Sequence, residues 1–282
     1  MTAAREVGVA QGIPSGEPSA IELRDAGLGF GKRTLWEGLN LSVAQGEFLV
    51  VLGPNGSGKT SLLRVLLGLQ GLTGGSVAVA GEAAGAGNRR VGYVPQQKTL
   101  GGSYSVRGRD LVGLGLDGHR WGIGLRARKQ RREKVEAALA AVGASEYADR
   151  PIGALSGGEQ QRLRVAQALV GEPDVLLCDE PLLSLDLAHQ HSVSELIGTA
   201  ARESGAAVVF VTHEINPVLK FADRILYLVD GRFRIGAPAE VMTTETLTEL
   251  YRSPVEVVRV REKLVVVGAD EAGCHHAEEG ED

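Results

Sequence analysis

Residues 48–60 read FLVVLGPNGSGKT, and residues 61–69 continue as SLLRVLLGL. The five apolar residues Phe48–Leu52 predict a strand that is buried on both faces. The apolar spacing of residues 61–69 predicts a helix. The loop between them, residues 53–60, fits the pattern G-x-x-x-x-G-K-[ST]. A strand, a glycine-rich loop and a helix in this order predict an α/β fold with a phosphate-binding loop.

The residue types in this loop suit a bound phosphate. Glycines let successive backbone N–H groups turn inward around an anion, and the positive end of the helix dipole adds to the attraction. We expect Lys59 to reach the β- and γ-phosphates of a nucleotide and the Thr60 hydroxyl to ligate Mg²⁺. The alternative is a glycine-rich turn without a ligand. The predicted nucleotide-binding residues are Gly53, Pro54, Asn55, Gly56, Ser57, Gly58, Lys59, Thr60 and Ser61.

A second apolar run ends in two carboxylates. Residues 175–180 read VLLCDE, which predicts a buried strand with Asp179 and Glu180 at its carboxyl end. We expect Asp179 to hold Mg²⁺ through water beside the phosphate loop, and Glu180 to act as general base on an attacking water. The alternative is a pair of carboxylates that only caps the strand. Cys178 is expected to be an inert buried thiol.

A second pair of glycines begins another predicted helix, at residues 155–162, which read LSGGEQQR. Ser156 and Glu159 have the spacing of a capping box, but a capping box does not account for the two glycines between them. Glycines there let the helix N-terminus approach an anion closely. Two phosphate-binding surfaces in one chain indicate a dimer with nucleotide between its copies. The residues predicted for this second surface are Leu155, Ser156, Gly157, Gly158, Glu159 and Gln160.

The composition is that of a globular chain. The 282 residues are 43% hydrophobic and 23% charged, and no stretch approaches the roughly 20 apolar residues that a membrane-spanning helix needs. The first twenty residues lack the apolar segment of a signal peptide. A net charge of −5 weighs against nucleic acid as a partner, because proteins that bind it usually carry a basic excess. The two cysteines are not spaced as a disulfide framework or a metal site.

The chain divides into three regions. Residues 1–20 are rich in Gly and Pro and are expected to form a flexible leader, and residues 21–268 are expected to form one domain. Within it, residues 100–170 carry helical rather than strand patterns, which predicts an inserted helical subdomain. Residues 269–282 are acidic and poor in apolar residues, so we expect a disordered tail.

Individual elements follow from the same patterns. Alternating or continuous apolar residues predict strands at residues 21–23, 39–43, 77–79, 91–94, 175–178, 208–211, 225–229 and 264–267. Helical spacing predicts helices at residues 61–69, 131–142 and 159–170. Gly231 predicts a hairpin turn.

Taken together, these motifs resemble those of the ATP-binding subunit of ABC transporters, over about residues 20–240. The resemblance implies a P-loop NTPase (RecA-like) core with an antiparallel β subdomain and an inserted α-helical subdomain. It identifies residues 53–60 as the Walker A loop, residues 155–162 as the signature motif, and Asp179 with Glu180 as the Walker B pair.

The resemblance also implies roles for residues that no local pattern singles out. Phe30 would stack on adenine, and Gln96 would sense Mg²⁺ and face the membrane partner. The loop Ser184-Leu185-Asp186 would cross the dimer, and His213 would contact the γ-phosphate. The implied catalytic set is Glu180, His213 and Gln96, and the implied Mg²⁺ set is Thr60, Gln96 and Asp179. Taken alone, Phe30 would be a core residue and His213 a structural histidine, so these two alternatives stay open.

The implied function is ATP hydrolysis with Mg²⁺ at two composite sites of a homodimer that forms when ATP binds. The implied partners are integral membrane permease subunits and, indirectly, an extracytoplasmic solute-binding protein, with no nucleic acid. The implied location is the cytoplasmic face of a bacterial cell membrane.

The cargo rests on a weaker resemblance. Residues 212–267 resemble the manganese and zinc importer subgroup. An importer of iron–siderophore or another small solute is the alternative, as is a soluble ABC ATPase outside transport. The tail residues Cys274, His275 and His276 would load or sense metal, or would be a solvated tail.

A basic run and two histidines remain to be interpreted. The basic run at residues 126–132 is a solvated helix face, or a contact with the partner or with anionic headgroups. His189 and His191 are expected on a helix surface.

Overall fold

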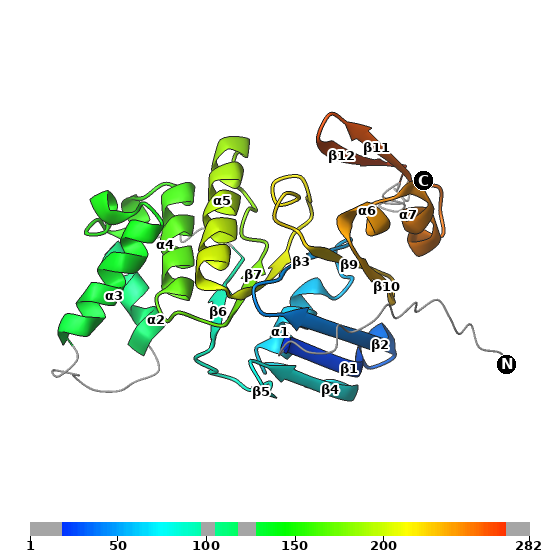
Figure 1. The fold of residues 1–282 in the computed structure, drawn as a ribbon, viewed down its shortest axis with the longest axis horizontal. Helices are drawn as coiled ribbons and strands as arrows, with labels where there is room; N and C mark the ends of the chain where they lie inside the picture. Colours follow the sequence, from blue (N-terminus) through cyan, green and yellow to red (C-terminus); the bar gives the residue numbers. More distant parts are fainter. Residues whose placement is uncertain (1–18, 97–104, 118–127, 269–282) are drawn as a thin grey trace, which may run out of the picture.

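The structure is a computed structural model that describes residues 19–96, 105–117 and 128–268 (Figure 1). At its centre is a six-stranded sheet, whose strands lie in the order β10 (Arg232–Gly236), β9 (Arg224–Val229), β3 (Phe48–Leu52), β8 (Ala207–Val211), β7 (Val175–Asp179) and β6 (Val91–Val94). Strand β10 pairs antiparallel with β9, and all the other pairings in this sheet are parallel. The predicted α/β class and P-loop fold are confirmed.

The central sheet is covered on both faces, as a parallel sheet must be. All five residues of β3 are buried. Leu49 and Val51 belong to one apolar core, whereas Phe48, Val50 and Leu52 belong to another on the opposite face. Successive side chains of a strand point to opposite faces, which explains why β3 is continuously apolar.

A second sheet covers one of these faces. It is antiparallel, in the order β2 (Arg33–Ala44), β1 (Ser19–Phe30), β4 (Gly74–Val79) and β5 (Glu82–Ala83). Helix α1 (Lys59–Leu66) packs into the core between the two sheets (Figure 1). Strands β1 and β2 have 12 residues each, far more than the sequence patterns predicted. The register shifts several times between them, and such bulges interrupt the alternation of apolar residues on which the prediction relied.

Helices gather at the other end of the molecule (Figure 1). Helices α2 (Gly108–Asp117), α3 (Arg128–Ala141) and α4 (Gly157–Leu169) pack on one another and on the central sheet, together with α5 (Leu187–Ser204). The predicted helices at residues 131–142 and 159–170 correspond to α3 and α4. The basic residues Arg128, Lys129 and Arg132 lie exposed at the start of α3, and Arg131 is half-buried. Residues 126–127 of that basic run lie outside the described residues.

The described part of the chain ends in a small unit beside β9 and β10 (Figure 1). This unit is formed by α6 (Pro238–Val241), α7 (Thr244–Tyr251) and the hairpin of β11 (Glu256–Val260) and β12 (Lys263–Val267). Asn216 joins this hairpin to the loop after β8, because its side chain bonds both the N–H and the carbonyl of Leu264. Residues 1–18 of the predicted leader and the Cys-His-His tail lie outside the described residues, whereas residues 19 and 20, also assigned to the leader, belong to β1. None of the described helices is long and apolar enough to span a bilayer.

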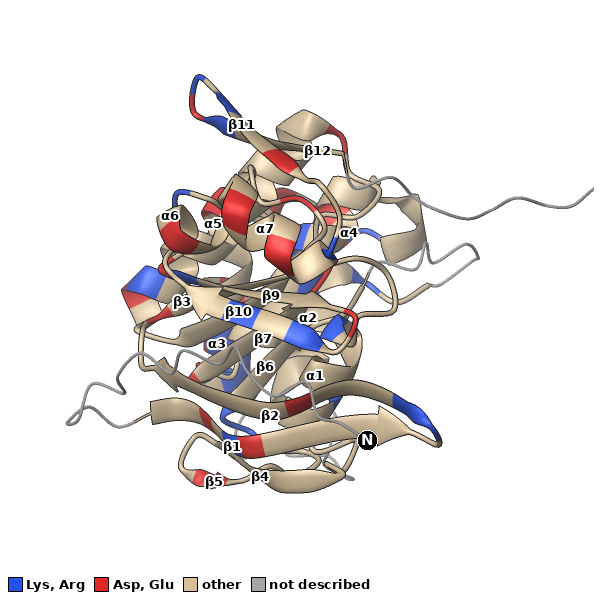
Figure 2. Ribbon diagram, turned by 90° about the vertical axis from the view of Figure 1, so that its right-hand side faces the viewer, with Lys and Arg blue, Asp and Glu red and all other residues tan. Residues whose placement is uncertain are grey.

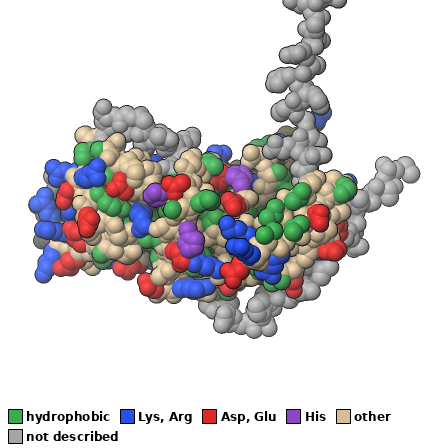
Figure 3. Space-filling model, turned by 90° about the horizontal axis from the view of Figure 1, so that it is seen from above, with side chains coloured by type: hydrophobic (Ala, Val, Ile, Leu, Met, Phe, Trp, Pro, Cys, Tyr) green, Lys and Arg blue, Asp and Glu red, His purple; other side chains and the backbone are tan. Residues whose placement is uncertain are grey.

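Charges of both signs are mixed over the surface. Figure 2 shows basic residues along β10 and at the tip of the β11–β12 hairpin, and acidic residues over α6 and α7. The view from above in Figure 3 likewise shows acidic, basic and apolar side chains intermixed, with histidines at the surface. Neither of these two faces is therefore dominated by charges of one sign.

Candidate functional site

The phosphate loop needs its glycines for steric reasons. Gly53, directly after β3, has φ 142°, and a Cβ atom there would lie 2.0 Å from the carbonyl oxygen of Leu228. Gly58 precedes α1 as its N-cap in the left-handed region, with φ 102°. Since a glycine cap carries no side chain, no side chain caps α1, and its first N–H groups can receive an anion.

Lys59 lies over this loop rather than in solvent. Its Nζ atom donates to the carbonyl oxygens of Gly53 at 2.7 Å and Pro54 at 3.0 Å. Burial lowers the pKa of Lys59, and the nearby Glu180 and Asp179 oppose that shift. The ammonium group is therefore held at the mouth of the glycine cradle, beside two carboxylates.

Hard oxygen donors converge next to the loop. The Thr60 hydroxyl donates to Oδ1 of Asp179 at 3.2 Å, and the Tyr93 hydroxyl donates to Oδ2 at 3.4 Å. Asp179 ends β7, and burial raises its pKa while the bond from Thr60 lowers it in part. A hydroxyl and a carboxylate oxygen suit Mg²⁺, which usually completes its shell with water and nucleotide phosphates. Two members of the predicted Mg²⁺ set, Thr60 and Asp179, thus fit this ion, whereas the amide of the third, Gln96, bonds Glu180.

The three residues predicted to be catalytic lie together. Glu180 is buried, and its carboxylate accepts from the Nε2 atoms of Gln96 at 2.9 Å and His213 at 2.6 Å. These residues follow β7, β6 and β8, whose carboxyl ends share one edge of the sheet, where α/β proteins bind their ligands. Glu180 has φ 46°, so the backbone turns sharply as it leaves the strand.

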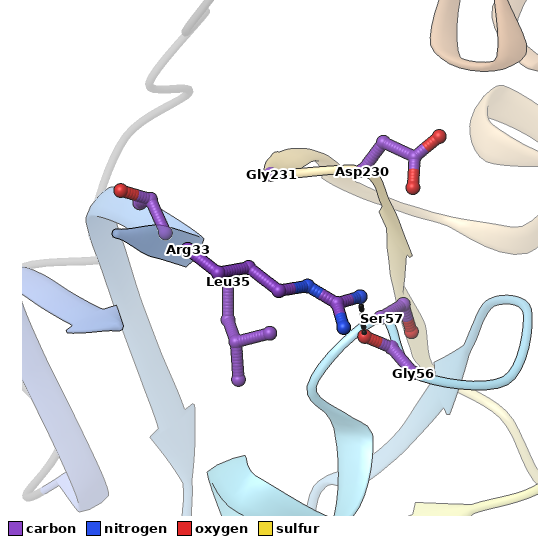
Figure 4. Close-up of a pocket in the computed structure, with 7 residues that line it drawn as sticks. Arg33, Leu35, Gly56, Ser57, Asp230 and Gly231 are labelled. Carbon is purple, nitrogen blue, oxygen red and sulfur yellow. Dashed lines mark hydrogen bonds between the residues drawn. The ribbon is translucent and has the colours of Figure 1, made fainter. Parts of the chain in front are cut away.

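The aromatic residue assigned to adenine lies at a hairpin tip. Phe30 ends β1 with 54% of its surface exposed, so it is not the core residue that was its alternative. Beside it, Arg33 donates from Nη2 to the carbonyl oxygen of Gly56 at 3.0 Å (Figure 4). A pocket between this hairpin, the phosphate loop and the turn after β9 is lined by Arg33, Thr34, Leu35, Gly56, Ser57, Asp230 and Gly231. The sequence analysis missed Arg33, because no local motif includes it.

The signature segment forms the start of α4. Ser156 is the N-cap, and its side chain and that of Glu159 make a complete capping box. Leu155 and Gln160 are buried, and the Gln160 amide donates to the carbonyl oxygens of Ile152 and Leu155. Ser156 and Gly157 are exposed. Part of the predicted second surface therefore serves the fold, and another part faces outward.

The loop Ser184-Leu185-Asp186 leads into α5, which lies beside α4 (Figure 1). Ser184 has φ 65°, and Asp186 is the N-cap of α5. Among the described residues no hydrogen bond or ion pair joins this loop or Ser156 to the phosphate loop. The structure therefore places the predicted residues in two groups, one at the edge of the central sheet and one at the tips of α4 and α5.

Two smaller predictions concern a cysteine and a pair of histidines. Cys178 is fully buried in β7, and burial raises the pKa of its thiol, so it is the inert thiol that was expected. His189 and His191 are on the exposed side of α5, with 50% and 66% of their side chains accessible. Among residues 19–96, 105–117 and 128–268, no group of three or more His, Cys, Asp or Glu residues is placed to hold a metal ion.

The fold and the phosphate loop define a nucleotide-binding protein of the P-loop class. A family model described as ABC transporter matches residues 36–183. An iron(3+)-hydroxamate import ATP-binding protein of Bacillus subtilis is 32% identical over 246 residues, which are 85% of this chain and 90% of that protein. The chain belongs to the ATP-binding subunits of ABC transporters, and the predicted family is confirmed. It is accordingly an ATP-hydrolysing subunit of an import system.

Solved structures agree with this assignment. A metal-chelate type ABC transporter in an inward-facing conformation aligns with a TM-score of 0.74 and 28% identity, over 88% of this chain and 96% of that chain. A dimeric ATP-binding cassette in a post-hydrolysis state, bound to ADP and Pi, aligns with a TM-score of 0.64 and 28% identity, over 77% of this chain and 98% of that chain. Other relatives, 32–38% identical, are named as import ATP-binding proteins for aliphatic sulfonates, hemin, zinc and cobalamin, and as the ATP-binding protein of a manganese transport system.

Proposed function

We propose that the chain binds ATP with Mg²⁺ at its phosphate loop and hydrolyses it with Glu180 as the general base. The observation that carries this proposal is the position of the Glu180 carboxylate. It is buried at the end of β7, held by Gln96 and His213, and lies beside the residue, Asp179, that contacts Thr60. A carboxylate fixed in this way next to a phosphate site is suited to take a proton from water.

Different residues of the site bind the phosphates, hold Mg²⁺ and position the general base. Lys59 and the N–H groups of α1 bind and orient the phosphates, and Thr60 with Asp179 holds Mg²⁺, which when bound neutralises charge on the phosphate oxygens. Gln96 and His213 keep the carboxylate of Glu180 in place while it accepts the proton of the attacking water. Phe30, exposed at the edge of the site, would stack on the adenine ring.

A homodimer completes the site. A nucleotide held by the phosphate loop of one copy would be closed in by the signature segment of a second copy, where Ser156 and Gly157 are exposed. The likeness to a dimeric cassette supports this arrangement. In the proposed cycle, ATP closes the dimer, and hydrolysis with loss of phosphate reopens it.

The chain would act on the cytoplasmic face of the membrane. Because it is related to import ATPases and has no helix among its described residues that could span a bilayer, permease subunits must supply the path for the cargo. An extracytoplasmic solute-binding protein would deliver the cargo to them. Nucleic acid has no part in this scheme.

The cargo that we propose is a divalent metal, zinc or manganese. Relatives named for manganese and zinc support it, at 32% and 34% identity. Relatives named for iron(3+)-hydroxamate and ferric enterobactin, at 32% and 35%, favour an iron–siderophore as the second candidate. The test uses the chain co-purified with its permease and placed in liposomes. Its ATPase activity should be stimulated by the binding protein loaded with zinc or manganese, and not by the binding protein loaded with an iron–siderophore.

Substituting the proposed base tests the mechanism. Glu180→Gln keeps the size of the side chain but removes its basicity, so ATP binding should persist while hydrolysis falls by on the order of a hundredfold or more. The measurements are single-turnover hydrolysis and the binding of a fluorescent ATP analogue. Glu203→Gln, an exposed residue near the end of α5, is the matched control for loss of one charge. Wild-type turnover in Glu180→Gln would exclude Glu180 as the base.

A further inference from the structure

His189 touches both segments of the proposed dimer-facing group. It is the third residue of α5, and its backbone N–H donates to Oδ1 of Asp186 at 3.0 Å. Its ring atom Nδ1 lies 2.7 Å from Oδ2 of the same carboxylate. One histidine therefore occupies both oxygens of the residue that caps α5 and ends the loop after β7.

The other edge of the same ring lies against the tip of α4. A Cβ atom on Gly158 would lie 2.4 Å from Cδ2 of His189 and 3.1 Å from its Nε2. The ring therefore packs directly against Gly158, and it would have to shift to make room for a side chain at this position.

Neighbouring interactions make the connection firmer. The side chain of Gln190 donates to the carbonyl oxygen of Leu185 at 3.1 Å, which fixes the loop from its other side. Hydrogen bonds from Ser156 lower the pKa of Glu159, and the charges of Arg150 and His189 add to that shift. Two contacts thus join α4 to α5: the ring of His189 packs on Gly158 at the helix tips, and Arg162 bonds the hydroxyl of Ser192 further along the two helices.

We propose that His189 is a positioning residue, which holds the loop 184–186 and the signature tip of α4 as one rigid unit. The inference rests on the proposed function, in which both segments face the nucleotide of a second copy. In that arrangement the loop and the tip of α4 must approach the nucleotide together. His189 acts through Asp186 and Gly158, and needs no contact with nucleotide itself.

The first test compares His189→Ala with His191→Ala. His191 lies two residues further along α5, and its ring is 3.9 Å from Glu195, so it controls for loss of an exposed histidine. For His189→Ala, we expect kcat of the assembled transporter to fall roughly tenfold, because one charge-assisted hydrogen bond is lost. The affinity of the isolated chain for ATP should stay unchanged, since the phosphate loop is intact, and His189→Asn should recover part of kcat. Equal kcat in His189→Ala and His191→Ala would overturn the proposal.

Hydrogen exchange supplies a readout that does not depend on catalysis. In His189→Ala, the backbone amides of residues 157–160 and of residues 184–189 should both exchange faster, because the contact that joins them is gone. Faster exchange confined to the first turn of α5 would show a merely local cap, and would also overturn the proposal. Exchange is measured on the isolated chain, so this result does not depend on hydrolysis. If the chain did not hydrolyse ATP, the proposed function would fail, but the exchange result would still test the role of His189.

A double-mutant cycle tests the contact with Gly158. Gly158→Ala should displace the ring of His189 and reduce kcat, and adding His189→Ala should cost less in that background than in the wild type. The two effects should therefore be less than additive. Strict additivity would mean that the ring and Gly158 do not act together, and would overturn the proposal.

Discussion

Helices α1 and α4 both begin beside glycines, but their N-termini are built in different ways. The N-cap of α1 is Gly58, which has no side chain to offer, so the first turn of the helix can receive an anion. The N-cap of α4 is Ser156, which forms a complete capping box with Glu159. The N-terminus of α1 thus has no side-chain cap and can accept a ligand, whereas the N-terminus of α4 is capped by side chains of its own chain.

The charged side chains in the first turns of the two helices differ as well, because α1 begins with a lysine and has no acidic residue in its first turn. Lys59 and Arg33 lie over the loop before α1, whereas α4 carries the carboxylate of Glu159 in its first turn. We therefore expect an isolated chain to bind nucleotide at α1 alone. The tip of α4 would contribute only when a second copy already presents a nucleotide, and each of the following predictions separates these two roles.

The largest effect is expected from Gly53→Ala. The added Cβ atom would lie 2.0 Å from the carbonyl oxygen of Leu228, and φ is 142°, so the phosphate loop cannot keep its shape. ATP affinity of the isolated chain should fall by on the order of a hundredfold or more, because the backbone N–H groups that wrap the phosphate are displaced. Equilibrium binding of a fluorescent ATP analogue measures it.

A control of the same chemistry is Gly71→Ala. Gly71 has an ordinary φ and nothing within 4 Å of an added Cβ atom, so affinity and thermal stability should match the wild type. If both substitutions reduced affinity alike, the binding site would not depend on the geometry of the loop.

An intermediate effect is expected from Ser156→Ala. Loss of the cap should destabilise the chain by about 1 kcal/mol, while ATP affinity of the isolated chain stays unchanged. Hydrolysis by the assembled dimer should fall roughly tenfold, the effect of losing one hydrogen bond to a charged group. Urea unfolding, ATP binding and steady-state hydrolysis give the three quantities.

Thr243→Ala separates capping from function. Thr243 caps α7 by accepting from the N–H of Thr246 at 3.2 Å, so its removal should destabilise the chain to a similar degree without slowing hydrolysis. A fall in hydrolysis of equal size in both variants would assign the effect of Ser156→Ala to stability alone.

The same contrast shows how far the sequence could predict this molecule. Strands β3 and β7, the phosphate loop and the cap of α4 depend on residues close together in the chain, and local patterns predicted all of them. The contact of Glu180 with His213 joins the ends of two strands that are neighbours in the sheet but distant in the sequence, and only the resemblance to a family indicated that both residues serve one site. The packing of His189 on Gly158 depends on how α5 lies against α4, which no local pattern contains.

The smallest effect is expected from Arg33→Gln, which removes a charge beside α1 but leaves the loop intact. Arg33 is exposed and bonds Gly56 at 3.0 Å, so water and salt screen its attraction for phosphate. ATP affinity should fall only about three- to fivefold, as for a surface charge pair worth up to about 1 kcal/mol. The loss should be smaller for ADP and absent for adenosine, and should shrink as salt is raised.

Lys32→Gln, an exposed neighbour in the same turn, controls for the loss of net charge. Equal losses for ATP and adenosine in Arg33→Gln would mean that Arg33 only shapes the pocket through its bond to Gly56. The charge difference between the tips of α1 and α4 would then have no part in selecting which of them binds nucleotide first.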